Sequence, residues 1–279
     1  MGVIVLYGDL HLHTTASDGL LSPAEVVDRA HNLGMAFLAI TDHDTVQGIA
    51  SATEKGNTLG IEVVSGIELS AEIDDTEIHI LGYFLEFQDS YLLKELQRLN
   101  EARNERAQQI VDKLNSLGLE ITMDKVIAMA GKGVVGRLHV ARVMVDMGYV
   151  ESIHSAFQNY IGYKKSAYIE RTKLSARDAI EIILKTKGLP VLAHPFLAGR
   201  DDLIPNLIEY GLQGIEVYHS EHDFRHIHHY LQLAKKYNLL VTGGSDCHGP
   251  LYKSKMLMGK VNIPYNHLES MKERRYNLF

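Results

Sequence analysis

The chain has 279 residues, of which 46% are hydrophobic, and its formal net charge is −7 at pH 7. This length permits one large α/β domain or two modest ones with a sizeable core. The acidic balance argues against a broad basic surface for long duplex nucleic acid, but it allows a short nucleotide held by metal ions and a few arginines.

Membrane and disulfide chemistry are both disfavoured. Cys247 is the only cysteine, so an intrachain disulfide is excluded. No apolar run approaches the ~18 residues of a membrane span, and no charged-then-apolar leader opens the chain. We therefore expect a cytoplasmic protein, a monomer or dimer, without a membrane partner.

The first part of the chain alternates predicted strands and helices. An apolar strand is predicted over residues 3–10. The capping box Ser22-Pro23-Ala24-Glu25 then predicts a helix that ends near Gly34. The short apolar run that follows is typical of a strand covered on both faces. Further predicted elements in this part are strands at 36–40, 62–64 and 78–80 and a helix at 45–57.

The periodicity changes after Phe87. Residues 89–165 repeat leucine, isoleucine and valine at helical spacing, with little strand signal. We predict an insertion of roughly three to five helices at 88–165, which divides a barrel domain into 1–87 and 166–279. Alternation then returns, with a helix opened by Ser175, helices near 202–210 and 221–237, and strands at 190–193, 214–217 and 239–242.

Seven predicted strands carry a histidine or a carboxylate at or near an end. Loops at the ends of parallel strands form a concave rim above a packed core, where metal-binding groups cluster. The pattern therefore predicts one polymetal site and a hydrolase that acts through it. The candidate ligands are His11, His13, Asp18, His43, Glu68, His79, His194, Asp246 and His248.

Local patterns give several of these residues specific roles. His11 and His13 lie two apart on a strand and should point the same way. His43 is predicted as a ligand oriented by Asp42 and Asp44, although Asp44 could also cap the next helix. Glu68 ends an apolar segment and could bridge two cations, with a salt bridge as the alternative.

The other positions leave alternatives open. Asp18 could be an ordinary loop residue, and His79 could be a hydrogen-bonded core histidine. Asp246 and His248 repeat the spacing of two, which places Cys247 on the opposite side as a packed side chain. Mixed nitrogen and oxygen ligands suit Mn²⁺, Fe²⁺ or Zn²⁺, with Mn²⁺ preferred here, and this set could hold about two or three ions that activate water for phosphoryl transfer.

Residues outside this set are candidates for substrate binding. Arg137 and His139 open a predicted helix in the insertion, where arginine and the helix N-terminus both favour phosphate. Arg171 and Arg200 are weaker candidates of the same kind, and His219 lies near the predicted rim. His222, His226 and His229 are spaced for a helix, and we expect them on a solvated face. The insertion could close over the site as a lid.

In order, the motifs resemble those of the PHP (polymerase and histidinol phosphatase) superfamily. They are D-L-H-x-H-T at 9–14, T-D-H-D at 41–44, Glu68, His79, A-H-P at 193–195 and S-D-x-H at 245–248. The resemblance implies a distorted (β/α)₇ barrel with a trinuclear metal site. It places one ion on His11, His13, Glu68 and Asp246, a second on Glu68, His79 and His194, and a third on Asp18, His43 and His248.

The helical insertion, G-R-x-H at 136–139 and the Tyr218-His219 pair resemble the small bacterial branch of this family. That branch includes phosphatases of nucleoside 3′,5′-bisphosphates and 5′–3′ exonucleases of short RNA, similar to ribonuclease AM. The resemblance implies a metal-dependent phosphoesterase whose substrate is a nucleotide or short oligonucleotide. The alternatives are a histidinol-phosphate phosphatase and a non-catalytic structural module.

Overall fold

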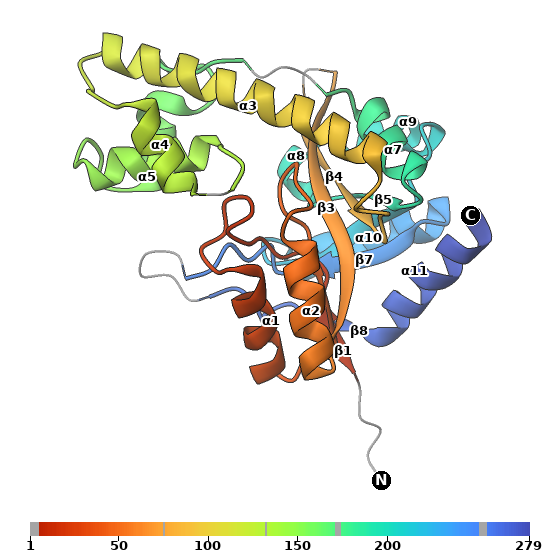
Figure 1. The fold of residues 1–279 in the computed structure, drawn as a ribbon. Coiled ribbons are helices and arrows are strands. Elements are labelled where there is room, and N and C mark those ends of the chain that lie inside the picture. The colour runs from red at the N-terminus through yellow and green to blue at the C-terminus, as the bar shows by residue number, and fades with distance from the viewer. Residues whose placement is uncertain (1–5, 75, 132, 171–173, 251–255) are drawn as a thin grey trace. The chain divides into compact units, whose positions relative to one another are not determined.

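The computed structural model describes residues 6–74, 76–131, 133–170, 174–250 and 256–279 (Figure 1). The chain divides into two compact units. The first comprises Met1–Leu93 and Leu174–Phe279, and the second is Lys94–Lys173. Among the described residues, no helix has both the length and the apolar character needed to cross a membrane.

The first unit is built on one sheet of eight strands in the order β7-β6-β5-β4-β3-β2-β1-β8. β1, β2 and β3 pair in parallel, as do β5, β6 and β7. The predicted α/β barrel architecture is confirmed, and β8, antiparallel to β1, is a strand that the sequence analysis did not predict. The strands are β1 (Tyr7–Asp9), β2 (Phe37–Ile40), β3 (Glu62–Ile73), β4 (Thr76–Tyr83), β5 (Leu189–Leu192), β6 (Gly214–His219), β7 (Leu240–Gly244) and β8 (Ile263–Pro264).

β3 and β4 form a hairpin that departs from the predicted arrangement. Both strands are longer than predicted, and β4 runs antiparallel to β3 and to β5. Ile73 pairs with Thr76, so the chain reverses within a tight connection. Because β4 starts at the edge where β3 ends, His79 lies near this edge although it is inside a strand.

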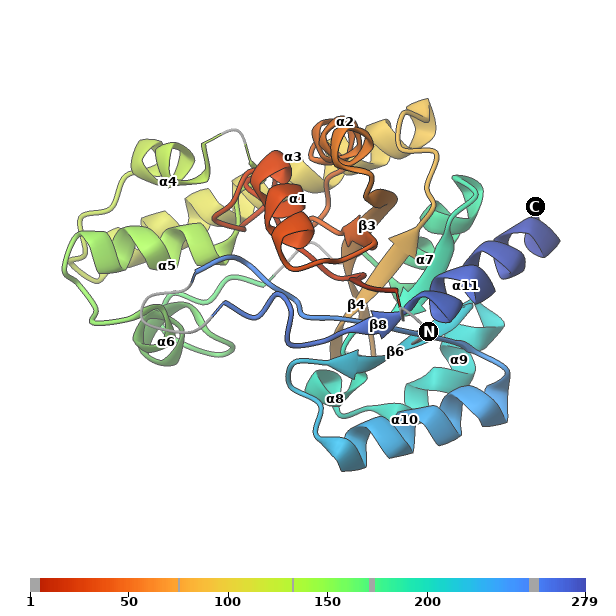
Figure 2. The same ribbon diagram turned by 90° about the horizontal axis from the view of Figure 1, so that it is seen from below.

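Helices pack on the outer face of this sheet, as Figures 1 and 2 show. α1 and α2 lie side by side, α7 packs on β3, β4 and β5, and α10 packs on β6 and β7. The helices of this unit are α1 (Pro23–Asn32), α2 (Ile49–Leu59), α7 (Ala176–Lys185), α8 (Pro195–Ala198), the 3₁₀ turn η2 (Asp201–Leu203), α9 (Ile204–Glu209), α10 (Phe224–Tyr237) and α11 (Tyr265–Leu278), and the long helix α3 (Ser90–Ser116) begins in it.

Helix starts follow the capping residues closely, with one exception. Ser22 and Glu25 form the predicted capping box of α1, and Ser175 caps α7 through the N–H of Asp178. The helix predicted from residue 45 starts only at Ile49, so the expectation that Asp44 caps it is wrong. Asp44 adopts a positive φ of 51°, and its carboxylate accepts a hydrogen bond from the N–H of Ser70 instead.

The second unit is helical and has its own apolar core. Side chains from α3, α4 and α5 fill it, including Ile110, Leu114, Val126 and Val140. Their helical spacing gives each helix one apolar stripe, which is buried against its neighbours. Besides the greater part of α3, the unit contains α4 (Met123–Ala130), α5 (Arg137–Asp146), α6 (Ile153–Ala156) and the short π-helix η1 (Phe157–Ile161).

Candidate metal centre

The candidate metal centre forms where the segments after β1 and β7 meet. Leu12 makes a parallel bridge with Cys247, which sets the two segments side by side. Because side chains alternate along extended backbone, His11 and His13 face one way while Leu12 packs into the core. Cys247 is buried on the same side as Leu12, so the prediction that it is a packed side chain is confirmed.

Glu68, near the middle of β3, is the centre of the cluster. Its side chain is 1% exposed. Oε1 is 2.7 Å from His79 Nδ1 and 3.1 Å from His194 Nε2. On the other oxygen, Oε2, three more histidine nitrogens converge at 3.3, 3.2 and 3.1 Å: His11 Nε2, His13 Nε2 and His43 Nδ1.

Two aspartates complete the cluster. Asp246 Oδ1 lies 3.4 Å from His11 Nε2 and 3.1 Å from His13 Nε2. Asp18 Oδ1 lies 3.3 Å from His248 Nε2, and the ring of His248 stacks on that of His13 with centroids 4.1 Å apart. The structure thus brings together all nine side chains selected from the sequence. Potential ligand atoms lie within 4.8 Å of one another in the sets His13, Asp18, His43, His248; His11, His13, Glu68, Asp246; and His43, Glu68, His79.

The donor atoms of this cluster fit metal ions. Among the described residues, several of its buried atoms have no hydrogen-bond partner: His11 Nε2, both ring nitrogens of His13, His43 Nδ1 and Glu68 Oε2. Burying polar atoms without partners is costly, so such atoms call for a partner that the polypeptide does not provide. Imidazole nitrogens and carboxylate oxygens converging in this way match the donor preferences of transition-metal dications.

The pKa values of the cluster also support metal binding. Burial opposes the charge on Glu68, yet His43 and His79 hold its pKa well below the usual range. Burial lowers the pKa of His43 to about 3. Against the effect of burial, nearby carboxylates raise the pKa of His13 to about 10 and that of His79 to about 9. Without a cation, these pKa values favour protonated rings at His13 and His79 near neutral pH, and a bound cation would displace those protons.

Three residues at this site have a strained backbone conformation. His194, Asp44 and Asp246 have positive φ angles of 24°, 51° and 52°. Non-glycine residues adopt such angles at a cost of about 1–3 kcal/mol each, and they persist where the surroundings enforce them. At His194, one such constraint is a hydrogen bond from its backbone N–H to Glu216 Oε2 at 2.7 Å.

Glu216 lies in one of the seven strands noted in the sequence analysis, but it was not included among the candidate site residues. It lies fully buried in β6, and its other oxygen, Oε1, accepts a hydrogen bond from His11 Nδ1 at 3.0 Å. With a proton held on Nδ1, Nε2 is the atom of His11 that would bind a cation, and it faces Glu68 and Asp246. Glu216 therefore positions two members of the cluster at once. The available signal was a carboxylate inside an apolar strand, the same signal that singled out Glu68.

Asp42 and Asp9 support the loops of the site. Asp42 accepts hydrogen bonds from the backbone and hydroxyl of Thr14 and from the Ser17 hydroxyl, at 2.7, 2.7 and 2.6 Å. Asp9 accepts from the backbone N–H groups of His11 and Ser245. Burial raises the pKa of Asp9 to about 6, against the effect of these hydrogen bonds. Asp9 thus ties the start of the loop after β1 to the segment after β7, and Asp42 ties the same loop to the segment after β2.

Among the substrate-binding candidates of the first unit, only His219 lies in the cluster. Its Nδ1 accepts a hydrogen bond from the N–H of Glu221, so the proton is on Nε2, which lies 3.5 Å from Asp246 Oδ2. Arg200 pairs through both Nε and Nη2 with Asp202 and also donates to Thr76. The guanidinium of Arg200 is therefore engaged in structural contacts with Asp202 and Thr76.

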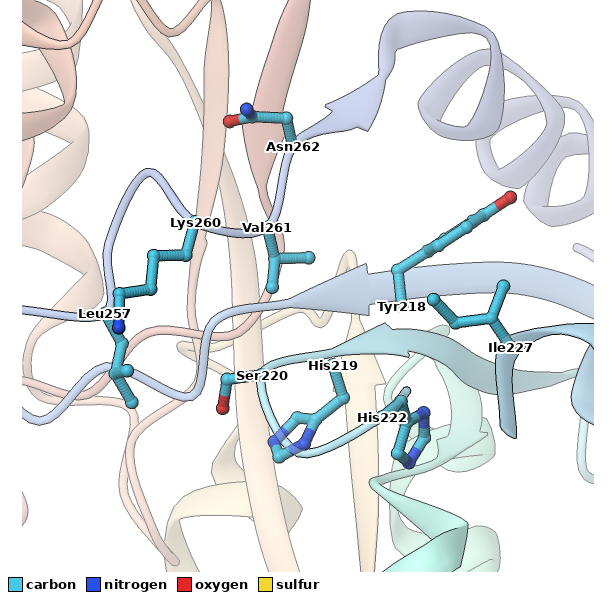
Figure 3. Close-up of a pocket in the computed structure, with 9 residues that line it drawn as sticks. All are labelled: Tyr218, His219, Ser220, His222, Ile227, Leu257, Lys260, Val261 and Asn262. Carbon is cyan, nitrogen blue, oxygen red and sulfur yellow. The ribbon is translucent and has the colours of Figure 1, made fainter. Parts of the chain in front are cut away.

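His219 also borders a cavity of about 310 Å³. Figure 3 shows its lining: Tyr218, His219, Ser220, His222, Ile227, Leu257, Lys260, Val261 and Asn262. The expected solvated position is wrong for His222, which is only 8% exposed and precedes α10. Its Nδ1 hydrogen-bonds to the carbonyl of Val217, which ties it to the end of β6.

The remaining candidates belong to the second unit. Gly136 is the N-cap of α5, so the predicted helix start before Arg137 is confirmed. His139 Nδ1 accepts a hydrogen bond from the N–H of Gly136, and the guanidinium of Arg137 lies over the ring of Phe157 at 5.7 Å. His139 is thus used in capping the helix. Arg171 lies outside the described residues.

Comparison with known proteins assigns the family. The PHP domain model matches residues 9–183. A 3′,5′-nucleoside bisphosphate phosphatase of Chromobacterium violaceum is 34% identical over 251 residues, or 87% of each chain. A 5′-3′ exoribonuclease of Haemophilus influenzae is 35% identical over 87% of this chain and 90% of its own.

A solved structure agrees with these matches. The crystal structure of a Bifidobacterium adolescentis protein assigned as a metal-dependent phosphoesterase has a TM-score of 0.88 at 30% identity, covering 96% of both chains. This coverage extends the likeness beyond residue 183, across almost the whole length of both proteins. The chain therefore belongs to the PHP domain family and is a hydrolase of its metal-dependent phosphoesterase group.

Proposed function

We propose that the protein hydrolyses phosphate esters of nucleotides. Its substrates would be nucleoside 3′,5′-bisphosphates, short oligoribonucleotides attacked from the 5′ end, or both. The observation that carries the proposal is the convergence of unpartnered imidazole and carboxylate atoms on Glu68. The relatives named as a bisphosphate phosphatase and an exoribonuclease, which cover most of both chains, support the substrate class.

We propose that two or three divalent ions, manganese foremost, are held by the nine clustered side chains. Both oxygens of Glu68 would take part, since they face different histidines: His79 and His194 on one side, and His11, His13 and His43 on the other. Such ions, when bound, acidify water and neutralise phosphate charge. His11, His13, Asp18, His43, Glu68, His79, His194, Asp246 and His248 would act through this binding.

Two residues beside the candidate ligands would assist: Glu216 would orient His11, and His219 would donate a hydrogen bond. Glu216 would hold a proton on His11 Nδ1, so that Nε2 is the atom presented to the cluster. His219 holds a proton on Nε2 beside Asp246 and is placed to donate a hydrogen bond to an oxygen bound there. We further propose that residues 88–165 contribute substrate contacts through Arg137, with 1–87 and 166–279 providing the metal site.

A substrate panel tests this function. The metal-loaded protein is assayed with adenosine 3′,5′-bisphosphate, AMP, short oligoribonucleotides and histidinol phosphate, in the presence of Mn²⁺. Turnover of a bisphosphate or an oligoribonucleotide is expected, and His194→Ala should abolish it while reducing the number of ions bound. Activity on histidinol phosphate alone would reject the nucleotide assignment.

A further inference from the structure

An exposed aromatic pair stands at the rim of the first unit. Phe196, in α8, is 41% exposed, although one part of its ring packs on the imidazole of His226. The two ring centroids are 3.9 Å apart, with an interplanar angle of 31°. The side chain of His226, in the first turn of α10, is itself 28% exposed. The pair therefore presents a supported aromatic surface to solvent.

This pair is adjacent to the candidate metal centre along the chain and in space. α8 begins directly after His194, whose Nε2 faces Glu68. A series of ring contacts runs outward from the cluster: the centroid of His194 is 5.5 Å from that of His219, His219 is 5.3 Å from His222, and His222 is 6.2 Å from Phe196. Phe196 is thus separated from His194 by two intervening rings and from His219 by one.

The position at the rim follows from the topology. β5 and β6 are parallel, so the segments that leave them, α8 and the start of α10, emerge at the same edge of the sheet. α8 also packs on β4, the strand that carries His79. The histidines of the cluster and the aromatic pair therefore belong to one edge of the sheet.

The chemistry of the surface favours a flat, unsaturated ligand. Phe196 is 41% exposed, so part of its aromatic surface can take part in stacking. Stacking of nucleobases on aromatic side chains is strong and largely independent of base identity. A nucleotide carries its base one sugar away from its phosphate, and Phe196 lies two positions after the cluster residue His194 in the chain.

We propose that Phe196, supported by His226, is the stacking platform for the nucleobase of a substrate whose reacting phosphate is held at the metal centre. The inference rests on the proposed nucleotide phosphoesterase function and adds the residue that would distinguish a nucleotide from a base-free phosphate ester. Because stacking is tolerant, the platform selects for the presence of a base and not for one particular base.

The test compares Phe196→Leu, Phe196→Tyr and the parent on a nucleotide and on its base-free counterpart, adenosine 3′,5′-bisphosphate and the same ribose bisphosphate without adenine. Leucine keeps the apolar bulk and removes the π face, whereas tyrosine keeps the ring. For Phe196→Leu we expect kcat/KM on the nucleotide to fall about 5- to 100-fold, mostly through KM. The base-free substrate should change less than about twofold, and Phe196→Tyr should behave as the parent on both.

Tyr276→Ala is the matched control. Tyr276 is 86% exposed on α11, and its substitution should leave kcat/KM unchanged on both substrates. Equal losses of Phe196→Leu on both substrates, or no loss on the nucleotide, would overturn the platform while leaving the phosphoesterase function intact. A parent enzyme that turns over neither substrate with Mn²⁺ would instead reject the proposed function itself.

Discussion

The two units of this protein use buried space in opposite ways. The second unit buries an apolar core formed by α3, α4, α5 and their neighbours. The first unit has an apolar core too, but beside it lie charged and polar side chains at 0–1% exposure, among them Asp9, His11, Glu68 and Glu216. Burial of apolar side chains stabilises the second unit directly. In the first unit, burial also leaves histidines and carboxylates available to bind cations. The comparison predicts different responses to substitution in each unit.

The largest effect should follow from changing Glu68. Glu68→Gln removes the negative charge on which the histidines converge, and we expect activity to fall by at least about a thousandfold, or about 4 kcal/mol of transition-state stabilisation. The parent should gain about 3 kcal/mol in free energy of unfolding at Mn²⁺ concentrations near a hundred times Kd, and the variant should lose most of that gain. Activity and Mn²⁺-dependent thermal stability measure the two effects. If Mn²⁺ stabilises the variant as much as the parent, Glu68 is not needed for metal binding.

A core substitution in the second unit should show the reverse pattern. Leu114 is fully buried, so Leu114→Ala should cost about 2–5 kcal/mol of stability through lost contacts and a cavity. The number of metal ions bound should not change, because the substitution leaves every cluster residue in place. Leu117→Ala, at a position 46% exposed, is the control and should cost much less. Chemical denaturation measures the loss of stability, and metal analysis measures the number of ions bound. A loss of bound metal in Leu114→Ala would contradict the expectation that this core affects stability alone.

Glu216→Gln should have an intermediate effect. The amide can still accept a hydrogen bond with its oxygen, but its NH₂ group cannot accept from the second donor, so either His11 Nδ1 or the His194 backbone N–H loses its partner. We expect a 10- to 100-fold loss of metal affinity, as is typical when a group that orients a ligand is removed. Calorimetric titration with Mn²⁺ measures it. Unchanged affinity with lower stability would reduce Glu216 to a purely structural residue.

Metal uptake by the chelated protein should release protons. The pKa values of about 10 for His13 and about 9 for His79 mean that both rings are protonated at pH 7.5 without metal, and both must give up a proton to bind a cation. Binding should therefore weaken as the pH falls. Titration of Mn²⁺ into lightly buffered protein with a pH indicator checks this. Uptake without any proton release would show that these histidines do not bind the ions.

The smallest expected effect belongs to Arg137. If the second unit contributes only binding contacts, Arg137→Ala should raise KM for a nucleotide by a few-fold to about tenfold and leave metal affinity unchanged. Arg98→Ala, at an exposed position of α3 paired with Glu95, is the matched control. A large drop in kcat with unchanged KM would contradict a simple binding role.

Much of the site could be predicted because its residues follow local rules. The spacing of two in His11-Leu12-His13 is enough to place both imidazoles on one side and Leu12 in the core. Glu68 is conspicuous because a charge inside an apolar strand needs a partner. The capping role considered for Asp44 is wrong, because an aspartate before a polar helical stretch has the same pattern as an N-cap, and only the strand beside it provides the N–H of Ser70 as a competing donor.

The sequence by itself determined which residues are candidates for the metal centre, since residue type, apolar surroundings and alternation are all local properties. The tertiary structure decided which atoms meet. Glu216 and His11 are 205 residues apart, and their hydrogen bond exists only because the strand order places β6 and β1 around one interior. The same holds for Phe196 and His226, which the parallel pairing of β5 and β6 brings to one edge. Contacts of this kind depend on the geometry of the closed fold, which no local pattern specifies.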